Sequence, residues 1–157
     1  MKKAWTFSIM INKNTLLNEI EITQMYQIMA ETGNIDAQFV YGKRLQNGEG
    51  LPKNRKYNNL EESFKWLKRS ADKGHIQAQN AMGYAFAHGL GVIENSRQSF
   101  MYYKCAADNG NDSAMYNIAL CYREGYGTHR NNIEFEKWIK YSCDAGYLPA
   151  IKTYNKF

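Results

Sequence analysis

Apolar residues recur every three or four positions along most of the chain, the spacing that places them on one face of an α-helix. In residues 15–32 this spacing runs from Leu16 to Met29, with Asn14 or Thr15 as the predicted N-cap and Gly33 as the predicted stop. The same criteria predict seven further helices: Ile35–Asn47, 60–73, Ile76–His88, 96–109, Asp112–Glu124, Asn132–Asp144 and a short one at 149–155. The chain is therefore predicted to be all-α.

Small residues recur at fixed offsets in these segments. Counted from Gly74, they stand at Ala78, Gly83, Gly89 and Gly91. The same offsets lead from Gly110 to Ala114, Ala119, Gly125 and Gly127, and from Gly33 to Ala37, Gly42, Gly48 and Gly50. The period is 36 residues, lengthened to 41 in the first unit. Such a period is typical of stacked helix-pair repeats.

The period divides the chain, residues 1–157, into one domain of repeats. Full repeats are predicted at 33–73, 74–109 and 110–145. Residues 1–32 are expected to form an N-terminal cap and a degenerate repeat, with the apolar strip at 1–14 lying across the first exposed helix face, and 146–157 a C-terminal capping helix. The two helices of a pair are expected to cross at Gly42, Gly83 and Ala119, where small residues let the backbones approach.

The repeating motif resembles that of a known family. It reads Ala-x-x-Gly-x-x-x-Ala-x-x-x-x-Gly-x-x-x-x-x-Gly-x-Gly, starts at Ala30, Ala71 and Ala107, and is followed by a second helix centred on an aromatic residue. This pattern resembles the Sel-one-like repeat, a relative of the tetratricopeptide repeat, over about residues 29–150. The resemblance implies a right-handed α-solenoid of antiparallel helix pairs with roughly eight helices. It also implies a non-enzymatic adaptor or scaffold that binds a protein or peptide partner.

The resemblance further indicates where such a partner would bind. In tetratricopeptide-like solenoids the first helix of each pair lines the concave side. The candidate partner-binding residues on these helices are Phe39, Lys43, Asn80, Tyr84, His88, Tyr116, Leu120 and Arg123. Aromatic residues at helical spacing have an alternative role in the core between repeats, so both interpretations stay open.

The lengthened first unit supplies a second candidate surface. Its extra residues fall in the loop at 51–59, which carries Lys53, Arg55, Lys56 and Tyr57. Insertions in repeat proteins lie on one face and can carry binding, although a solvated basic loop is the simpler interpretation. Self-association through the solenoid ends is a further expectation.

Charge and targeting signals narrow the function classes only slightly. The 20 Lys and Arg exceed the 15 Asp and Glu to give a net charge of +5, which favours acidic partners but falls short of a nucleic-acid-binding pattern. No stretch is long and apolar enough to span a membrane. The start of the chain resembles a signal peptide without a cleavage site, so a cytoplasmic location is predicted, with periplasmic and secreted locations left open.

Residues suited to catalysis or metal binding are few. The three histidines, His75, His88 and His129, stand at different repeat offsets without a second ligand three or four residues away. No glycine-rich phosphate loop and no nucleophile with a base is recognisable. The sequence therefore predicts no catalytic residue, no metal and no cofactor. An immunity-type inhibitor of a toxin and, from another class, a hydrolase of the repeat family remain the alternatives.

The three cysteines, Cys105, Cys121 and Cys143, show the spacing of neither a metal site nor a disulfide framework. We predict that they are small buried or half-buried thiols, which favours a reducing compartment.

Overall fold

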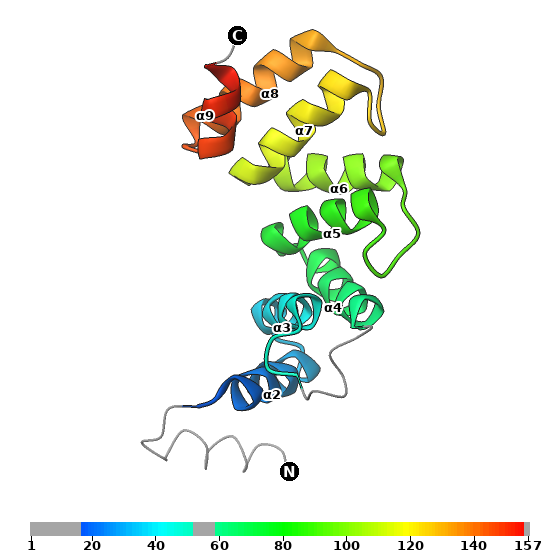
Figure 1. The fold of residues 1–157 in the computed structure, drawn as a ribbon, viewed down its shortest axis with the longest axis vertical. Helices are drawn as coiled ribbons and strands as arrows, with labels where there is room; N and C mark the ends of the chain where they lie inside the picture. Colours follow the sequence, from blue (N-terminus) through cyan, green and yellow to red (C-terminus); the bar gives the residue numbers. More distant parts are fainter. Residues whose placement is uncertain (1–16, 52–58, 156–157) are drawn as a thin grey trace.

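The computed structural model describes residues 17–51 and 59–155. Within these residues it contains eight helices and no strand: α2 (Glu19–Glu31), α3 (Ile35–Asn47), α4 (Leu60–Asp72), α5 (Ile76–His88), α6 (Ser96–Asp108), α7 (Asp112–Glu124), α8 (Asn132–Asp144) and α9 (Leu148–Tyr154). The helices stack in chain order into an elongated α-solenoid, with α2 near one end and α9 at the other (Figure 1). The predicted all-α solenoid is confirmed.

The predicted helix limits hold closely except at α2. The helices α3, α5, α7 and α8 begin and end at the predicted residues, while α4 and α6 end one residue earlier. The prediction that the first helix begins after Asn14 or Thr15 is wrong, because Asn18 is the N-cap of α2. Its side chain accepts a hydrogen bond from the Glu21 N–H, and the Glu21 carboxylate accepts one from the Asn18 N–H. The predicted strip at 1–14 lies outside the described residues.

The two helices of each pair cross where the sequence places a small residue. A Cβ atom added to Gly42 would lie 2.9 Å from Cγ of Leu67 on the facing helix α4. A Cβ atom added to Gly83 would lie 2.5 Å from the ring of Tyr103 on α6. Ala119, at the corresponding place on α7, is fully buried. Small residues are therefore required at these crossings, as predicted from their spacing.

The last glycine of each Gly-x-Gly turn connects one repeat to the next. A Cβ atom on Gly91 would lie 2.1 Å from the carbonyl oxygen of Leu60, the first residue of α4. The same distance separates a Cβ on Gly127 from the oxygen of Ser96, the first residue of α6. Gly50 makes the equivalent approach to Glu19 at the start of α2. The contact at Glu19 gives α2 the place of a second helix in a leading repeat.

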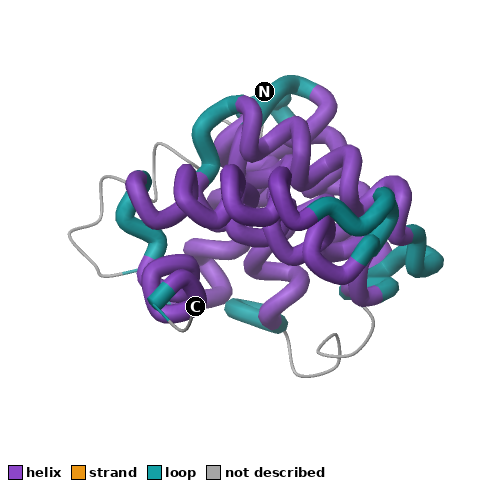
Figure 2. The backbone as a smooth tube through the Cα atoms, turned by 90° about the horizontal axis from the view of Figure 1, so that it is seen from above, coloured by secondary structure: helices purple, strands orange, loops and turns teal. Residues whose placement is uncertain are grey.

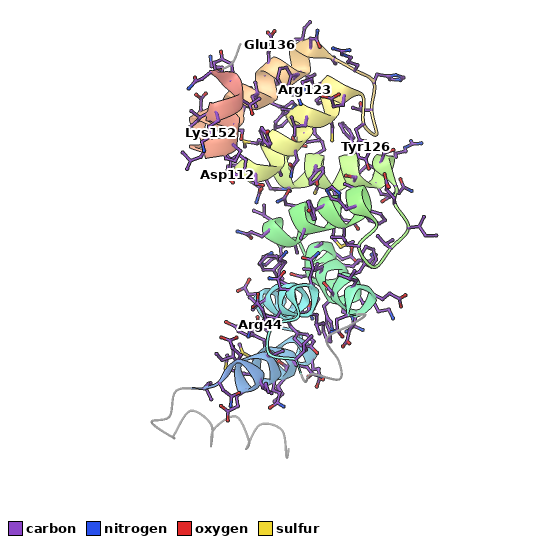
Figure 3. The ribbon with its side chains drawn as sticks, viewed as in Figure 1. Arg44, Asp112, Arg123, Tyr126, Glu136 and Lys152 are labelled. Carbon is purple, nitrogen blue, oxygen red and sulfur yellow. The ribbon has the colours of Figure 1, made fainter. Side chains whose placement is uncertain are left out.

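The junction between α2 and α3 has apolar contacts, made by Tyr26 and Met29 of α2, and in addition a polar network. The later junctions pack Phe64 against Phe86 and Phe100 against Tyr122, with ring centroids 5.5 and 5.4 Å apart. At the first junction Arg44, on the side of α3 that faces α2 (Figure 3), donates hydrogen bonds to the Thr23 hydroxyl and to the Glu19 carboxylate and carbonyl. This network adds to the apolar contacts that hold α2 against α3.

Viewed along the stack, the helices overlap closely and their connecting turns gather at the edges (Figure 2). Among the described residues, no helix combines the length and the apolar character that crossing a membrane requires.

Candidate functional site

A groove of about 520 Å³ runs across the first helices of the three full repeats. We name it the first-helix groove. Its lining residues come from α3, α5, α7 and the turns before α7 and α9: Phe39, Lys43, Gln46, Gln77, Asn80, Ala81, Tyr84, Asn111, Ser113, Asn117 and Tyr147. Because equivalent helices of successive repeats build it, the groove is a direct product of the repeat spacing.

Amide side chains supply most of the polarity of this groove. Five of the lining residues are Asn or Gln, and the Asn117 Nδ2 donates to the Asn80 Oδ1 over 3.1 Å between α7 and α5. An amide offers both donor and acceptor atoms, as a peptide backbone does. The groove can therefore pair with the main chain of an extended segment.

Lys43 is the one charged residue among the lining residues described. It is half-buried, and burial lowers the pKa of its ammonium group, an effect that the nearby Glu49 carboxylate opposes. Its Nζ atom donates to the Gln46 Oε1. The groove thus carries one positive charge whose hydration is already reduced.

Tyr84 is the aromatic residue that the groove exposes most, with 49% of its surface accessible. Its ring lies 4.2 Å, centroid to centroid, from the imidazole of His88, which is exposed one turn further along α5. Exposed tyrosines supported by a neighbouring ring are frequent anchors in protein interfaces.

The structure brings four of the eight candidate residues, Phe39, Lys43, Asn80 and Tyr84, into this groove. His88 lies beside them through its contact with Tyr84. The other three do not line the groove: Tyr116 and Leu120 are half-buried, and Arg123 lines a different groove. The loop candidates Lys53, Arg55, Lys56 and Tyr57 lie outside the described residues. Whether any of these residues binds a partner stays a prediction.

Two of the aromatic candidates also pack between repeats. The Phe39 ring stacks on His75, with centroids 4.5 Å apart, and the Tyr116 ring lies 5.6 Å from that of Tyr147. In both pairs the partner is the residue directly before the next first helix. Packing between repeats, the alternative role expected for aromatic residues at helical spacing, is therefore at least part of the role of Phe39 and Tyr116.

The sequence pattern did not indicate that Asn111, Asn117 and Tyr147 line the groove. Asn111 and Tyr147 occupy the N-cap position of α7 and α9, and capping was the role expected at helix starts. Tyr147 makes no side-chain capping hydrogen bond, however, and its hydroxyl lies 3.5 Å from that of Ser113. The first helices of the other repeats have Asn or His at this N-cap position. The aromatic residue at position 147 was therefore the sequence feature that could have indicated a role other than capping.

His75 is the N-cap of α5 and lies against the groove residue Phe39. Its Nδ1 atom accepts a hydrogen bond from the Ala78 N–H over 3.1 Å, a role that Asn34 and Asn111 fill in the other repeats. Burial lowers the pKa of His75, and the Asp36 carboxylate opposes that shift from 3.5 Å. The capping bond requires an unprotonated Nδ1, so this histidine is kept neutral.

We expect His75 to make stability depend on pH. Since its folded-state pKa is lowered, its stabilising effect is complete above the ordinary histidine pKa of about 6.5 and is lost as the pH falls through the lowered value. The loss should be about 1 kcal/mol, the worth of one N-cap, partly offset by Asp36. The control His75→Asn keeps a cap without a titrating group. Thermal unfolding at pH 7 and pH 5 should show wild type losing stability relative to this variant; an unchanged difference would contradict the role of His75.

A second groove, of about 560 Å³, lies at the C-terminal end of the stack. We name it the end groove, and its lining residues are Arg123, Arg130, Asn132, Phe135, Glu136, Ile139 and Tyr154. Arg123 on α7 and Glu136 on α8 mark it in Figure 3. The Arg123 guanidinium lies over the Phe135 ring and is paired with Glu124 over 2.7 Å, while Arg130 is exposed.

The cysteines differ from one another in burial. Cys121 is buried, which raises the pKa of its thiol to about 12, and Cys143 is half-buried. The prediction is wrong for Cys105, which is exposed because α6 turns Tyr103 and Ala106 toward the core and Cys105 away from it. All three thiols are free. In the described part of the chain, no group of three or more His, Cys, Asp or Glu side chains is arranged to hold a metal ion.

The positive charge of the chain is unevenly distributed. Residues 1–16, 52–58 and 156–157 hold seven Lys and Arg and no Asp or Glu. The described residues consequently carry 13 basic and 15 acidic side chains. The helical body is therefore slightly acidic, and the preference for acidic partners expected from the net charge does not extend to its surface as a whole.

Comparison with known proteins identifies the repeats. The model of the Sel1 repeat matches residues 35–75, 76–111 and 112–147. Each matched range begins two residues after the boundary expected from the glycine pattern. No curated protein matches the chain.

Solved structures share the fold. A Sel1 repeat protein from Oxalobacter formigenes is 26% identical with a TM-score of 0.76, over 85% of this chain and 51% of that one. A protective antigen of uropathogenic Escherichia coli with an SLR fold is 28% identical with a TM-score of 0.76, over 83% of this chain and 27% of that one. This chain thus spans about half and about a quarter of those proteins.

A third structure, Helicobacter pylori cysteine rich protein B, is 18% identical with a TM-score of 0.59, over 73% of this chain and 89% of that one, and shows the fold alone. The three matched repeats cover most of the chain, and the glycines that define them make the helix crossings and repeat contacts described above. The chain therefore belongs to the Sel1 repeat family.

Proposed function

We propose that this protein binds an extended segment of a partner protein in the first-helix groove. Sel1 repeat proteins generally serve as non-catalytic scaffolds for protein contacts. The observation that carries the proposal is that the first helices of three successive repeats, α3, α5 and α7, contribute side chains to one continuous groove. Continuous surfaces of this kind are the usual binding surfaces of solenoids.

The chemistry of the groove supports a peptide rather than a small metabolite. Its amides come from all three first helices, from Gln46 on α3 to Asn117 on α7, and they offer donors and acceptors to the polar groups of a main chain. Tyr84 offers an exposed ring for a hydrophobic side chain of the partner. Lys43 favours an acidic residue or a carboxylate at the α3 end of the groove.

The proposal is tested by selecting peptides from a random phage-displayed library against the 157-residue protein and measuring the best binders by fluorescence polarisation. Tyr84→Ala and Lys43→Glu should each weaken binding by about tenfold or more. Tyr141→Ala is the matched control, because Tyr141 is 46% exposed but lies on α8 and does not line the groove. Selected peptides that bind wild type and both groove variants equally would contradict the proposal.

A further inference from the structure

We propose that the first-helix groove binds its partner segment as a polyproline II helix, with one turn of that helix for each repeat. An acidic residue of the segment lies beside Lys43, and a large apolar residue three positions away lies beside Tyr84. The inference rests on the proposed function, and it adds the conformation and the sequence class of the segment.

Neighbouring first helices touch through their side chains as they follow one another along the stack (Figure 1). The Phe39 ring of α3 stacks on His75, the residue directly before α5, and Asn117 of α7 donates to Asn80 of α5 over 3.1 Å. Helices in such contact lie about 8–10 Å apart. Anchors on neighbouring repeats are therefore separated by about this distance.

This spacing fits a polyproline II helix better than a β-strand. A polyproline II helix advances about 9 Å in its three-residue turn and then presents a side chain in the same direction again. A β-strand repeats its direction after two residues, about 7 Å, or after four, about 13 Å. A partner in the β conformation would therefore fall out of step with the repeats, whereas a polyproline II helix stays in register.

Lys43 and Tyr84 occupy the same place in neighbouring repeats. Each stands ten residues after the glycine that begins its repeat, Gly33 for Lys43 and Gly74 for Tyr84. Both line the groove, and Lys43 is the charged residue among its lining residues described, so an acidic side chain complements it. The partner side chains that face Lys43 and Tyr84 are therefore one turn, or three residues, apart.

Ala81 leaves room for an apolar side chain next to Tyr84. It is half-buried and lies three residues before Tyr84, on the same side of α5. Ala81 and Phe39 both line the groove and pack against the same buried core cluster. The corresponding residues of the other full repeats, Val40 and Asn117, are larger. This niche, with aromatic walls and a small floor, fits a side chain such as Leu, Met or Phe.

The amides of the groove suit a main chain that has no hydrogen bonds of its own. A polyproline II helix leaves its carbonyl oxygens unpaired. The bond from Asn117 to Asn80 uses one of the two hydrogens on the Asn117 Nδ2 atom, so the other can donate to such an oxygen. Proline removes N–H groups but keeps the carbonyls. The partner motif is therefore acidic-x-x-apolar, in which both intervening residues can be proline.

Labelled peptides of defined spacing provide the probe. The cores Glu-Pro-Pro-Leu and Leu-Pro-Pro-Glu cover both chain directions, each between Gly-Ser flanks, and fluorescence polarisation follows their binding to the 157-residue protein. The better of the two should bind with a dissociation constant of about 0.1 mM. Removing or adding one proline should weaken it by about tenfold, because the apolar residue then misses Tyr84. Replacing Pro-Pro with Gly-Gly should weaken it by about threefold, because the free peptide is less ordered.

Variants of the protein locate the two anchors. Lys43→Glu should weaken the better peptide by about tenfold, and exchanging the peptide's Glu for Lys should restore binding to this variant. Ala81→Leu fills the niche, so a tenfold preference for Leu over Ala in the peptide should shrink to less than about twofold. Ala81→Val, the residue of the first repeat, is the milder version. Ala145→Leu, at an exposed position directly after α8, is the control and should keep the preference.

The outcomes separate this inference from the proposed function. Equal binding of the three spacings, a preference for the shorter or longer one, or an unchanged preference in both Ala81 variants would overturn the polyproline II register. Library-selected peptides that depend on Tyr84 would leave the proposed function standing if neither defined peptide bound, and this inference would then be wrong. Binding of every peptide unchanged by Tyr84→Ala would overturn both.

Discussion

Replacing Gly91 with alanine is expected to lower the free energy of unfolding by about 3 kcal/mol or more. Gly91 has φ +71°, a conformation that costs an ordinary residue about 1–2 kcal/mol. Its added Cβ atom would also lie 2.1 Å from the Leu60 carbonyl oxygen, which belongs to the backbone and cannot rotate away. The first two full repeats would have to separate to make room.

Gly89→Ala provides the matched control for this prediction. Gly89 has nearly the same φ, +64°, but the nearest atom to its added Cβ, the Val92 carbonyl oxygen, lies at 3.5 Å, an ordinary contact. Gly89→Ala should therefore lose only the conformational cost of about 1–2 kcal/mol. Urea unfolding followed by circular dichroism measures both variants. Equal losses would show that the approach of Gly91 to Leu60 does not hold the repeats together.

Replacing Gly83 with leucine is expected to destabilise the protein by about 2–3 kcal/mol. A Cβ atom at this position would lie 2.5 Å from the Tyr103 ring, and the ring is itself buried with 5% of its surface exposed. Neither helix of the α5–α6 pair can absorb the added volume without moving away from the other. The melting temperature should fall by several degrees.

Two further variants test this explanation. Tyr84→Leu places leucine one residue along α5 on the exposed side, and it should change stability by less than about 1 kcal/mol. The double variant Gly83→Leu with Tyr103→Ala should lose less stability than the sum of the two single variants, because the two positions are in contact. An unchanged melting temperature in Gly83→Leu would remove the basis for the crossing model.

The sequence was sufficient for the fold because the same residues that repeat also determine the geometry. Gly83 is needed at the helix crossing and Gly89 at the helix end, so their spacing sets the positions of both helices. The start of α2 was predictable as well. Asn14, Thr15 and Asn18 are all capping residues, but only Asn18 has a glutamate three positions later, Glu21, and the structure shows that pair as a capping box.

The sequence was less informative about the candidate site, because lining a groove depends on contacts between repeats. Tyr116 was predicted to face a partner, yet it packs against Tyr147 at the turn before α9. Arg123 shares the first-helix pattern but lines the end groove, with Arg130 in the turn after α7 and Asn132 at the start of α8. The role of Gly91 between repeats was likewise hidden, since its spacing indicated only a turn.

Site-specific photo-crosslinking in the native cell tests whether a partner protein binds in the first-helix groove. A benzophenone amino acid replaces Tyr84 in one strain and the equally exposed Tyr141 in another. If the partner binds there, we expect a crosslinked protein from position 84 and none from position 141. A partner crosslinked from position 141 and not from position 84 would contradict it.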